Sequence, residues 1–173
     1  MISEKMKKLA QNNSVIRAMF EEGNRMAAKY GRENVYDFSL GNPNFPAPEA
    51  VKTAIVDLLS SEEPMAVHGY MSNAGFEPVR KAVADSLNRR FATSFDAGNI
   101  LMSVGAAGAL NVALKTLLNP GDEVAVFAPY FVEYGNYAAN YDGVLKAVAP
   151  NIPGFQPDPE KLAALVTPRT KAL

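Results

Sequence analysis

Residues 100–110 place a strand, a turn and a helix in direct succession, and this arrangement constrains the fold more than any other feature of the chain. Residues 100–104 are apolar and are predicted as a β-strand, and the small residues from Gly105 to Gly108 form a tight turn that opens a helix. The free amides and the positive dipole end of such a helix point into the turn, where a phosphate can approach closely. Close packing of the small residues is the alternative interpretation.

The alternation of strands and helices continues beyond this turn. Asn119-Pro-Gly-Asp122 and Asp142-Gly143 are turn signals that separate the elements. Further strands are predicted at residues 123–128, at 144–148 and from 170 on, and helices at 76–91, from 129 to about 140, and after Asp158. Strands that alternate with helices indicate an α/β protein with a mostly parallel sheet.

The first thirty residues have a helical pattern instead. Two helices are predicted, with Ser3 and Ser14 as N-caps, and the second ends near Tyr30-Gly31, where the glycine suits the position after a helix. The apolar stripe of the second helix can pack either in a core or on a partner subunit.

A proline-rich connector then divides the chain. Residues 35–40 are predicted as a half-buried strand, and the three prolines within residues 41–48 exclude a regular element there. Pro48 is predicted in the first turn of the next helix. We therefore expect an N-terminal arm at residues 1–47 and an α/β body at residues 48–173.

A long loop is predicted after this helix. The helix is expected to bury the apolar face formed by Val51, Ile55, Leu58 and Leu59. Residues 60–75 are polar and small, and a connection of this length favours a functional or interface role. His68 is expected to make a loop contact, and Arg80 is expected to make structural ion pairs.

The composition excludes several classes of function. A net charge of −1 offers no basic surface for nucleic acid, and a chain without cysteine has no disulfide or thiolate metal site. The single histidine lacks partners for a metal site. No apolar run approaches the ~20 residues of a membrane span, and the charged N-terminus shows no signal peptide. We expect a cytoplasmic protein without nucleic-acid, membrane or metal partners.

Five segments together resemble the N-terminal half of the fold type I pyridoxal-phosphate aminotransferases, in order and in spacing. They are Leu40-Gly-Asn-Pro-Asn-Phe45, Tyr70 with Ala74-Gly75 and Val79-Arg80, Val104-Gly-Ala-Ala-Gly-Ala-Leu110, Asn119-Pro-Gly-Asp-Glu-Val124 and Ala128-Pro-Tyr-Phe131. The resemblance implies a three-layer α/β sandwich that forms the first half of the large, cofactor-binding domain. Residues 1–47 would then belong to the small domain.

The resemblance also implies which residues hold pyridoxal 5'-phosphate. The backbone amides of Gly105, Ala106 and Ala107 would bind its phosphate, and Phe131 would stack on its pyridine ring. Tyr70 resembles the tyrosine that reaches across a dimer interface to the neighbouring subunit's phosphate. Many relatives carry a hydroxyl residue in the phosphate turn, so one side-chain hydrogen bond is expected to be missing at Ala106 or Ala107.

The resemblance places Gly41 beside the substrate carboxylate and places no catalytic residue in this chain. In the family, the Schiff-base lysine and the carboxylate that protonates the pyridine nitrogen follow the strand that begins here at Thr170. Lys115 and Lys146 have no family counterpart in that role. We expect that the chain as given cannot run the reaction.

The function implied for the intact protein is amino transfer between an L-amino acid and a 2-oxo acid, in a homodimer with shared active sites. The alternatives are another fate of the same carbanion, such as C–S β-elimination or cyclisation by an aminocyclopropane-carboxylate synthase, and a non-catalytic ligand-binding module. A purely structural role in oligomerisation is a further alternative. The residues do not define which amino acid is the substrate.

Overall fold

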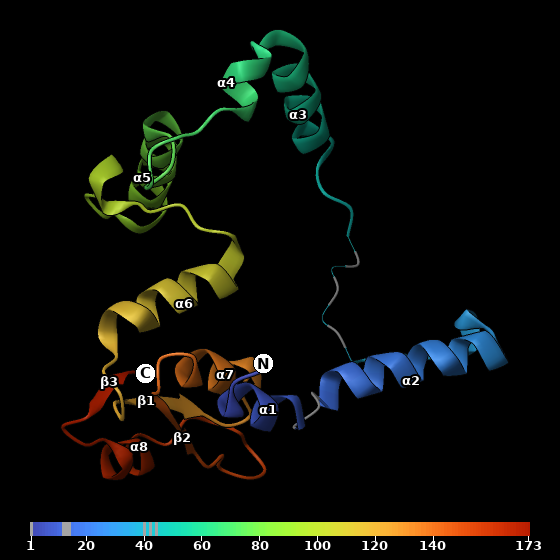
Figure 1. The fold of residues 1–173 in the computed structure, drawn as a ribbon, viewed down its shortest axis with the longest axis vertical. Coiled ribbons are helices and arrows are strands. Elements are labelled where there is room, and N and C mark those ends of the chain that lie inside the picture. The colour runs from blue at the N-terminus through green and yellow to red at the C-terminus, as the bar shows by residue number, and fades with distance from the viewer. Residues whose placement is uncertain (1, 12–14, 40, 42, 44) are drawn as a thin grey trace. The chain divides into compact units, whose positions relative to one another are not determined.

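The structure is a computed structural model that describes residues 2–11, 15–39, 41, 43 and 45–173 (Figure 1). The chain divides into two compact units, Met1–Gly69 and Tyr70–Leu173, and each is described by itself. The boundary expected near residue 47 is a different division, and it stays a prediction.

The described part of the first unit is helical. Its elements are α1 (Glu4–Gln11), α2 (Val15–Tyr30), η1 (Arg32–Asn34, a 3-10 helix), α3 (Glu49–Ser61) and α4 (Pro64–His68). Ser3 caps α1 as predicted, because its side-chain oxygen accepts the Met6 amide at 3.3 Å. Gly31 ends α2 as predicted, with a φ of 87° that glycine adopts without strain. Ser14, the other predicted cap, lies outside the described residues.

The strand predicted at residues 35–40 is wrong for its described part. Val35 has extended backbone angles, but residues 35–38 are irregular and no described segment pairs with them as a neighbouring strand. A strand pattern needs a ladder partner, and the segment instead lies along α2. Leu40, the last residue of the predicted strand, lies outside the described residues.

The region around α3 also differs from expectation. Pro48 is the N-cap of α3, one position before the predicted first turn. The expected loop at residues 60–75 contains α4, because Pro64 presets the φ of its first turn. The face of α3 that was expected to be buried is 48–58% exposed. Among the described elements its main neighbour is the short α4, which is too small to cover it.

The second unit contains the sheet. Its elements are α5 (Glu77–Phe91), η2 (Ala97–Asn99), α6 (Gly105–Leu117), β1 (Glu123–Phe127), α7 (Glu133–Ala139), β2 (Val144–Val148), α8 (Pro159–Leu165) and β3 (Thr170–Ala172). The strands are parallel and their order is β2-β1-β3, with α7 and α8 contacting β2 (Figure 1). The α/β class with a parallel sheet is therefore confirmed.

The two neighbours of β1 are held to different extents. The residues of β1 and β2 pair one to one along both strands. β3 pairs with β1 only at Glu123–Thr170 and Val124–Ala172, and a bulge separates these two positions. The bulge therefore makes the pairing of β3 with β1 irregular.

The core of this unit lies between α6, α7 and the sheet. Leu114 of α6, Val124 of β1 and Ala138 of α7 are buried together. Partly buried residues surround them, namely Leu118, Tyr137, Tyr141, Leu145 and Ala172. The turn before β1 forms as predicted, and the Asn119 amide donates to the Asp122 carboxylate at 2.9 Å, which lowers the pKa of Asp122.

The strand predicted at residues 100–104 is wrong. The segment is irregular, and its one backbone anchor to the α5 region is the Met102 amide, which donates to the Ala74 carbonyl at 3.0 Å. The described strands pair in the order β2-β1-β3, and this segment is not added to either outer edge of that sheet. The turn at Gly105 therefore follows an extended connection rather than a sheet strand.

Candidate functional site

The predicted phosphate turn is an open helix N-terminus. α6 begins at Gly105, whose φ of 66° is in the left-handed region, and a Cβ built there would meet no atom within 4 Å. Val104, the N-cap, provides no side-chain hydrogen bond to the helix. The amides of Ala106 and Ala107 belong to the first turn, where helical amides have no partner within the helix. Uncapped donors beside open space fit a phosphate group.

Asn111 connects the first turn of α6 to the end of α7. Its Nδ2 donates to the Ala107 carbonyl at 2.8 Å, and its Oδ1 accepts from Asn140 Nδ2 at 3.0 Å and from the Tyr141 hydroxyl at 3.3 Å. Asn111 was not predicted as a functional residue from the sequence. The one available signal was an asparagine inside a helix, where its propensity is poor.

Phe131 lies beyond the carboxyl end of β1, after the cis peptide bond between Ala128 and Pro129. Its ring is 50% exposed and contacts the Tyr134 ring edge-on, at 5.7 Å between centroids. The exposed part of the ring leaves area for a flat ligand. Within the described residues, no interaction joins Phe131 to the turn at Gly105.

The remaining predicted site residues, Tyr70 and Gly41, are both exposed. Tyr70 begins the second unit and is fully exposed, with no hydrogen bond inside the described part of the chain. Gly41 belongs to the first unit, and a Cβ built on it would also meet nothing within 4 Å. Of the predicted site residues, the structure brings together only the three consecutive positions Gly105, Ala106 and Ala107.

The two lysines considered in the sequence analysis are both engaged elsewhere. Lys146 Nζ pairs with Glu123 at 2.8 Å, and Lys115 Nζ lies 5.4 Å from the centre of the Tyr141 ring. Arg80 does not make the expected ion pairs. Its Nε donates to the Gly75 carbonyl at 3.1 Å, and its guanidinium also donates to the carbonyl of Ala97, so it fixes two loops by backbone contacts.

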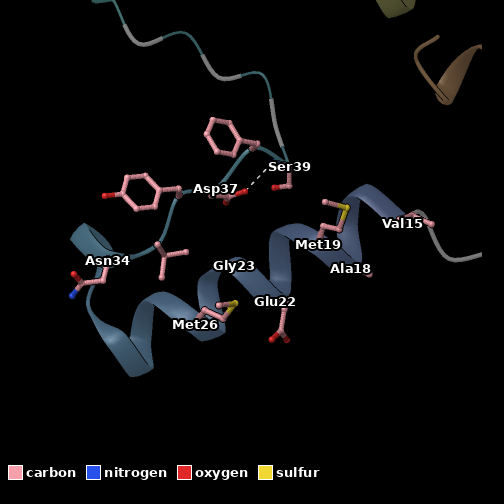
Figure 2. A pocket seen from close by; sticks show the side chains of 12 residues that line it. Val15, Ala18, Met19, Glu22, Gly23, Met26, Asn34, Asp37 and Ser39 are labelled. Carbon is pink, nitrogen blue, oxygen red and sulfur yellow. Dashed lines mark hydrogen bonds between the residues drawn. The ribbon is translucent and has the colours of Figure 1, made fainter. Parts of the chain in front are cut away.

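A groove of about 720 Å³ lies along α2 in the first unit (Figure 2). Met19 and Met26 form its α2 side, and Gly23 lies between them, facing Asp37 (Figure 2). A Cβ on Gly23 would come within 3.0 Å of the Asp37 carboxylate, so glycine permits this close approach. The Ser39 amide donates to Asp37 Oδ1 at 2.9 Å, and this contact with Ser39 lowers the pKa of Asp37. The lining is mostly apolar, and its two carboxylates, Glu22 and Asp37, both have lowered pKa values, so neither is suited to hold a proton for acid catalysis near neutral pH.

Neither a metal-binding cluster nor a membrane-spanning helix is present in the described part of the chain. It contains no cluster of three or more histidine, aspartate or glutamate side chains that could hold a metal ion. None of its helices has the length and apolar character needed to cross a membrane. The open N-terminus of α6 is therefore the strongest candidate for a ligand site.

The family model for aminotransferase class I and II matches residues 33–173. Among curated proteins, the probable aspartate/prephenate aminotransferase of Thermus aquaticus is 36% identical over 135 residues, which is 77% of this chain and 34% of that protein. The arginine–pyruvate transaminase of Pseudomonas aeruginosa is 33% identical over 142 residues, or 82% of this chain and 35% of that protein. The chain thus spans about a third of the length of these relatives.

Solved structures are similar over nearly the whole chain. A crystal structure of an amino transferase from Eubacterium rectale matches with a TM-score of 0.92 and 37% identity, over 98% of this chain and 43% of that one. The aspartate aminotransferase of Thermus thermophilus with maleate matches with a TM-score of 0.81 and 29% identity, over the same shares of the two chains.

Proposed function

Because the chain belongs to the aminotransferase class I and II family, we propose that the whole protein transfers an amino group between an L-amino acid and a 2-oxo acid with pyridoxal 5'-phosphate. The observation that carries this proposal is the family match over residues 33–173. The open, uncapped first turn of α6 supports it, because the match includes a turn that fits the cofactor phosphate. No observation favours a lyase or a non-catalytic module.

The proposed roles of this chain's residues are in binding rather than in bond breaking. The amides of Ala106 and Ala107, with Gly105 opening the turn, bind the phosphate, and Phe131 packs on the pyridine ring. When bound, the cofactor supplies the ring that accepts electrons from the substrate. The Tyr70 hydroxyl donates a hydrogen bond to the phosphate held by a second subunit.

Substrate binding and assembly complete the proposal. The backbone amide of Gly41 binds the substrate carboxylate, and its exposed, uncrowded position leaves room for it. We place the arm and small-domain part at residues 1–47 and the cofactor domain at 48–173. The proposed assembly is a homodimer, because the role of Tyr70 requires a second subunit. The proposed compartment is the cytoplasm.

Binding of phosphate by the turn can be tested with a proline substitution. Ala106→Pro removes one first-turn amide, and proline is tolerated at this end of a helix because the lost amide makes no helical bond. We expect the affinity for pyridoxal phosphate to fall by about tenfold, the usual effect of losing one hydrogen bond to a charged group. Isothermal titration of the purified protein measures it, and circular dichroism checks the fold.

Glu49→Pro is the matched control, because it removes a first-turn amide from α3 instead, and the extended backbone of Pro48 accepts a following proline. This variant should bind the cofactor as the unsubstituted protein does. Equal loss in both variants, or no loss in Ala106→Pro, would contradict the proposed phosphate site. The reaction itself is tested by incubating the full-length protein with an amino acid and 2-oxoglutarate and measuring glutamate.

A further inference from the structure

A buried carboxylate lies at the start of β1, at the opposite end of the strand from Phe131. Glu123 is 1% exposed, which is rare for a glutamate unless its charge is compensated. The proposed function uses no group at this end of the sheet. Its four side-chain partners come from β2 and from the chain around β3.

The two carboxylate oxygens of Glu123 have different partners. Oε2 accepts from the Thr167 hydroxyl at 2.7 Å and from the Thr170 hydroxyl at 3.2 Å. Oε1 faces two cations, Lys146 Nζ at 2.8 Å and an Arg169 nitrogen at 3.4 Å. One oxygen is thus bound by the hydroxyls beside β3, and the other is shared by a lysine of β2 and an arginine of the turn before β3.

The same carboxylate organises the turn that precedes β3. The Thr170 hydroxyl accepts the Thr167 amide at 2.9 Å while it donates to Glu123, and the Thr167 hydroxyl accepts the Arg169 amide at 3.2 Å. The Glu123 amide donates to the Arg169 carbonyl at 2.8 Å. These contacts surround the bulge at which the β1–β3 register shifts.

We propose that the Glu123 carboxylate sets the register of β3. Neutralising its charge releases residues 167–173 from β1, while the ladder between β1 and β2 stays formed. The physical reason is the distribution of the side chains that bind the carboxylate. Three of the four, Thr167, Arg169 and Thr170, belong to residues 167–170, and only Lys146 belongs to β2. β2 is also paired with β1 at five consecutive backbone positions, so it does not depend on the carboxylate in the same way.

The charged groups around the Glu123 carboxylate determine at which pH it is protonated. Lys146 faces the carboxylate from β2, Arg169 faces it from the turn before β3, and Asp122 is its acidic neighbour on β1. Two cations therefore surround Glu123, and its pKa is lowered to about 2, first by the hydrogen bond from Lys146 and then by that from Thr167. The carboxylate therefore stays charged at neutral pH and holds residues 167–173, and it is protonated and releases them only in strong acid.

Hydrogen exchange of the purified chain tests the proposal. In Glu123→Gln, the amide oxygen still accepts from the threonines but the charge is lost. We expect exchange of the amides at 167–173 to accelerate by at least about tenfold, the scale of one charge-assisted hydrogen bond, with less than about twofold change in β2. Thr170→Val removes one of the two hydroxyls that donate to Glu123 Oε2 and introduces no polar group. This variant should accelerate exchange of the same amides.

Glu160→Gln, at an exposed position in the first turn of α8, is the matched control and should leave both strands unchanged. Equal acceleration in β2 and in residues 167–173 would show general destabilisation and would overturn the proposal. Unchanged exchange at 167–173 in both Glu123→Gln and Thr170→Val would overturn it as well. If Glu123→Gln fails to fold, Thr170→Val and the acid dependence of exchange protection in the unsubstituted chain decide the question.

Discussion

Glu123 makes the stability of the fold depend on acid in a defined direction. Its pKa is about 2 in the folded chain and has an ordinary value of 4.5, so the folded state binds its proton less readily than the unfolded state. The stabilisation is fully present above pH 4.5 and is lost as the pH falls toward 2. Other carboxylates with lowered pKa values, such as Asp122 and Asp158, act in the same direction.

The contribution of Glu123 is isolated by comparing the chain with its Glu123→Gln variant. We expect the urea midpoint of the unsubstituted chain to lie well above that of the variant at pH 7, and this difference to shrink between pH 4.5 and 2. Urea unfolding followed by circular dichroism at several pH values measures it. A difference that stays constant over this range would show that the charge of Glu123 is not responsible.

Single residues were predicted correctly where their chemistry is local. Ser3 caps α1 through its hydroxyl, Gly31 ends α2 because it has no Cβ to oppose a positive φ, and the Asn119 turn forms as its sequence indicates. Arg80 and Asn111 could not be predicted in the same way. Their partners are carbonyls and side chains brought near by the fold, and no spacing in the sequence reports such contacts.

Among the elements, the paired strands and most helices were predicted correctly, whereas two extended segments were wrongly predicted as strands and the short helix α4 was predicted as part of a loop. The patterns at residues 123–128 and 144–148 yield β1 and β2 because the two segments pair with each other. Residues 35–38 and 100–104 have similar apolar patterns, but neither has a ladder partner in the described chain. A periodic pattern specifies a strand only where a second strand lies beside it.

The attachment of residues 100–104 to the loop before α5 gives a prediction at this scale. Gly75 has a φ of 97°, and a Cβ there would lie 2.5 Å from Met102 Cγ. We expect Gly75→Ala to lower the free energy of unfolding by about 1–3 kcal/mol, through backbone strain and a clash in the Met102 contact. Thermal or urea unfolding measures the change.

Two further glycines separate strain from the clash. Gly121→Ala is placed at a φ of 83° with nothing within 4 Å and carries strain alone, whereas Gly154→Ala meets neither problem. The expected order of destabilisation is therefore Gly75, then Gly121, then Gly154. A loss at Gly75 no greater than at Gly121 would mean that the Met102 contact accommodates a side chain.

At the scale of the whole molecule, the sequence predicted the family and the parallel sheet but not how the proposed site is completed. The proposed phosphate turn is a local feature, built by consecutive residues from Gly105 on. The proposed roles of Gly41 and Tyr70 depend on another unit or a second subunit, and such roles follow from assembly rather than from local pattern. The candidate site therefore divides into a part that short-range sequence determines and a part that it does not.

The last prediction concerns what this chain can do with the cofactor. A lysine that forms an imine with the cofactor must present an unprotonated amine beside the phosphate site. Lys146 is held by Glu123 at the opposite end of β1, and Lys115 lies over the Tyr141 ring. We therefore expect the purified chain, mixed with pyridoxal phosphate, to bind it reversibly without the near-visible absorbance of a lysine-bound cofactor. Dialysis should remove the cofactor completely, and adding an amino acid should leave the protein's absorbance spectrum unchanged. A band that survives dialysis and shifts with amino acid would show that a lysine of this chain is catalytic.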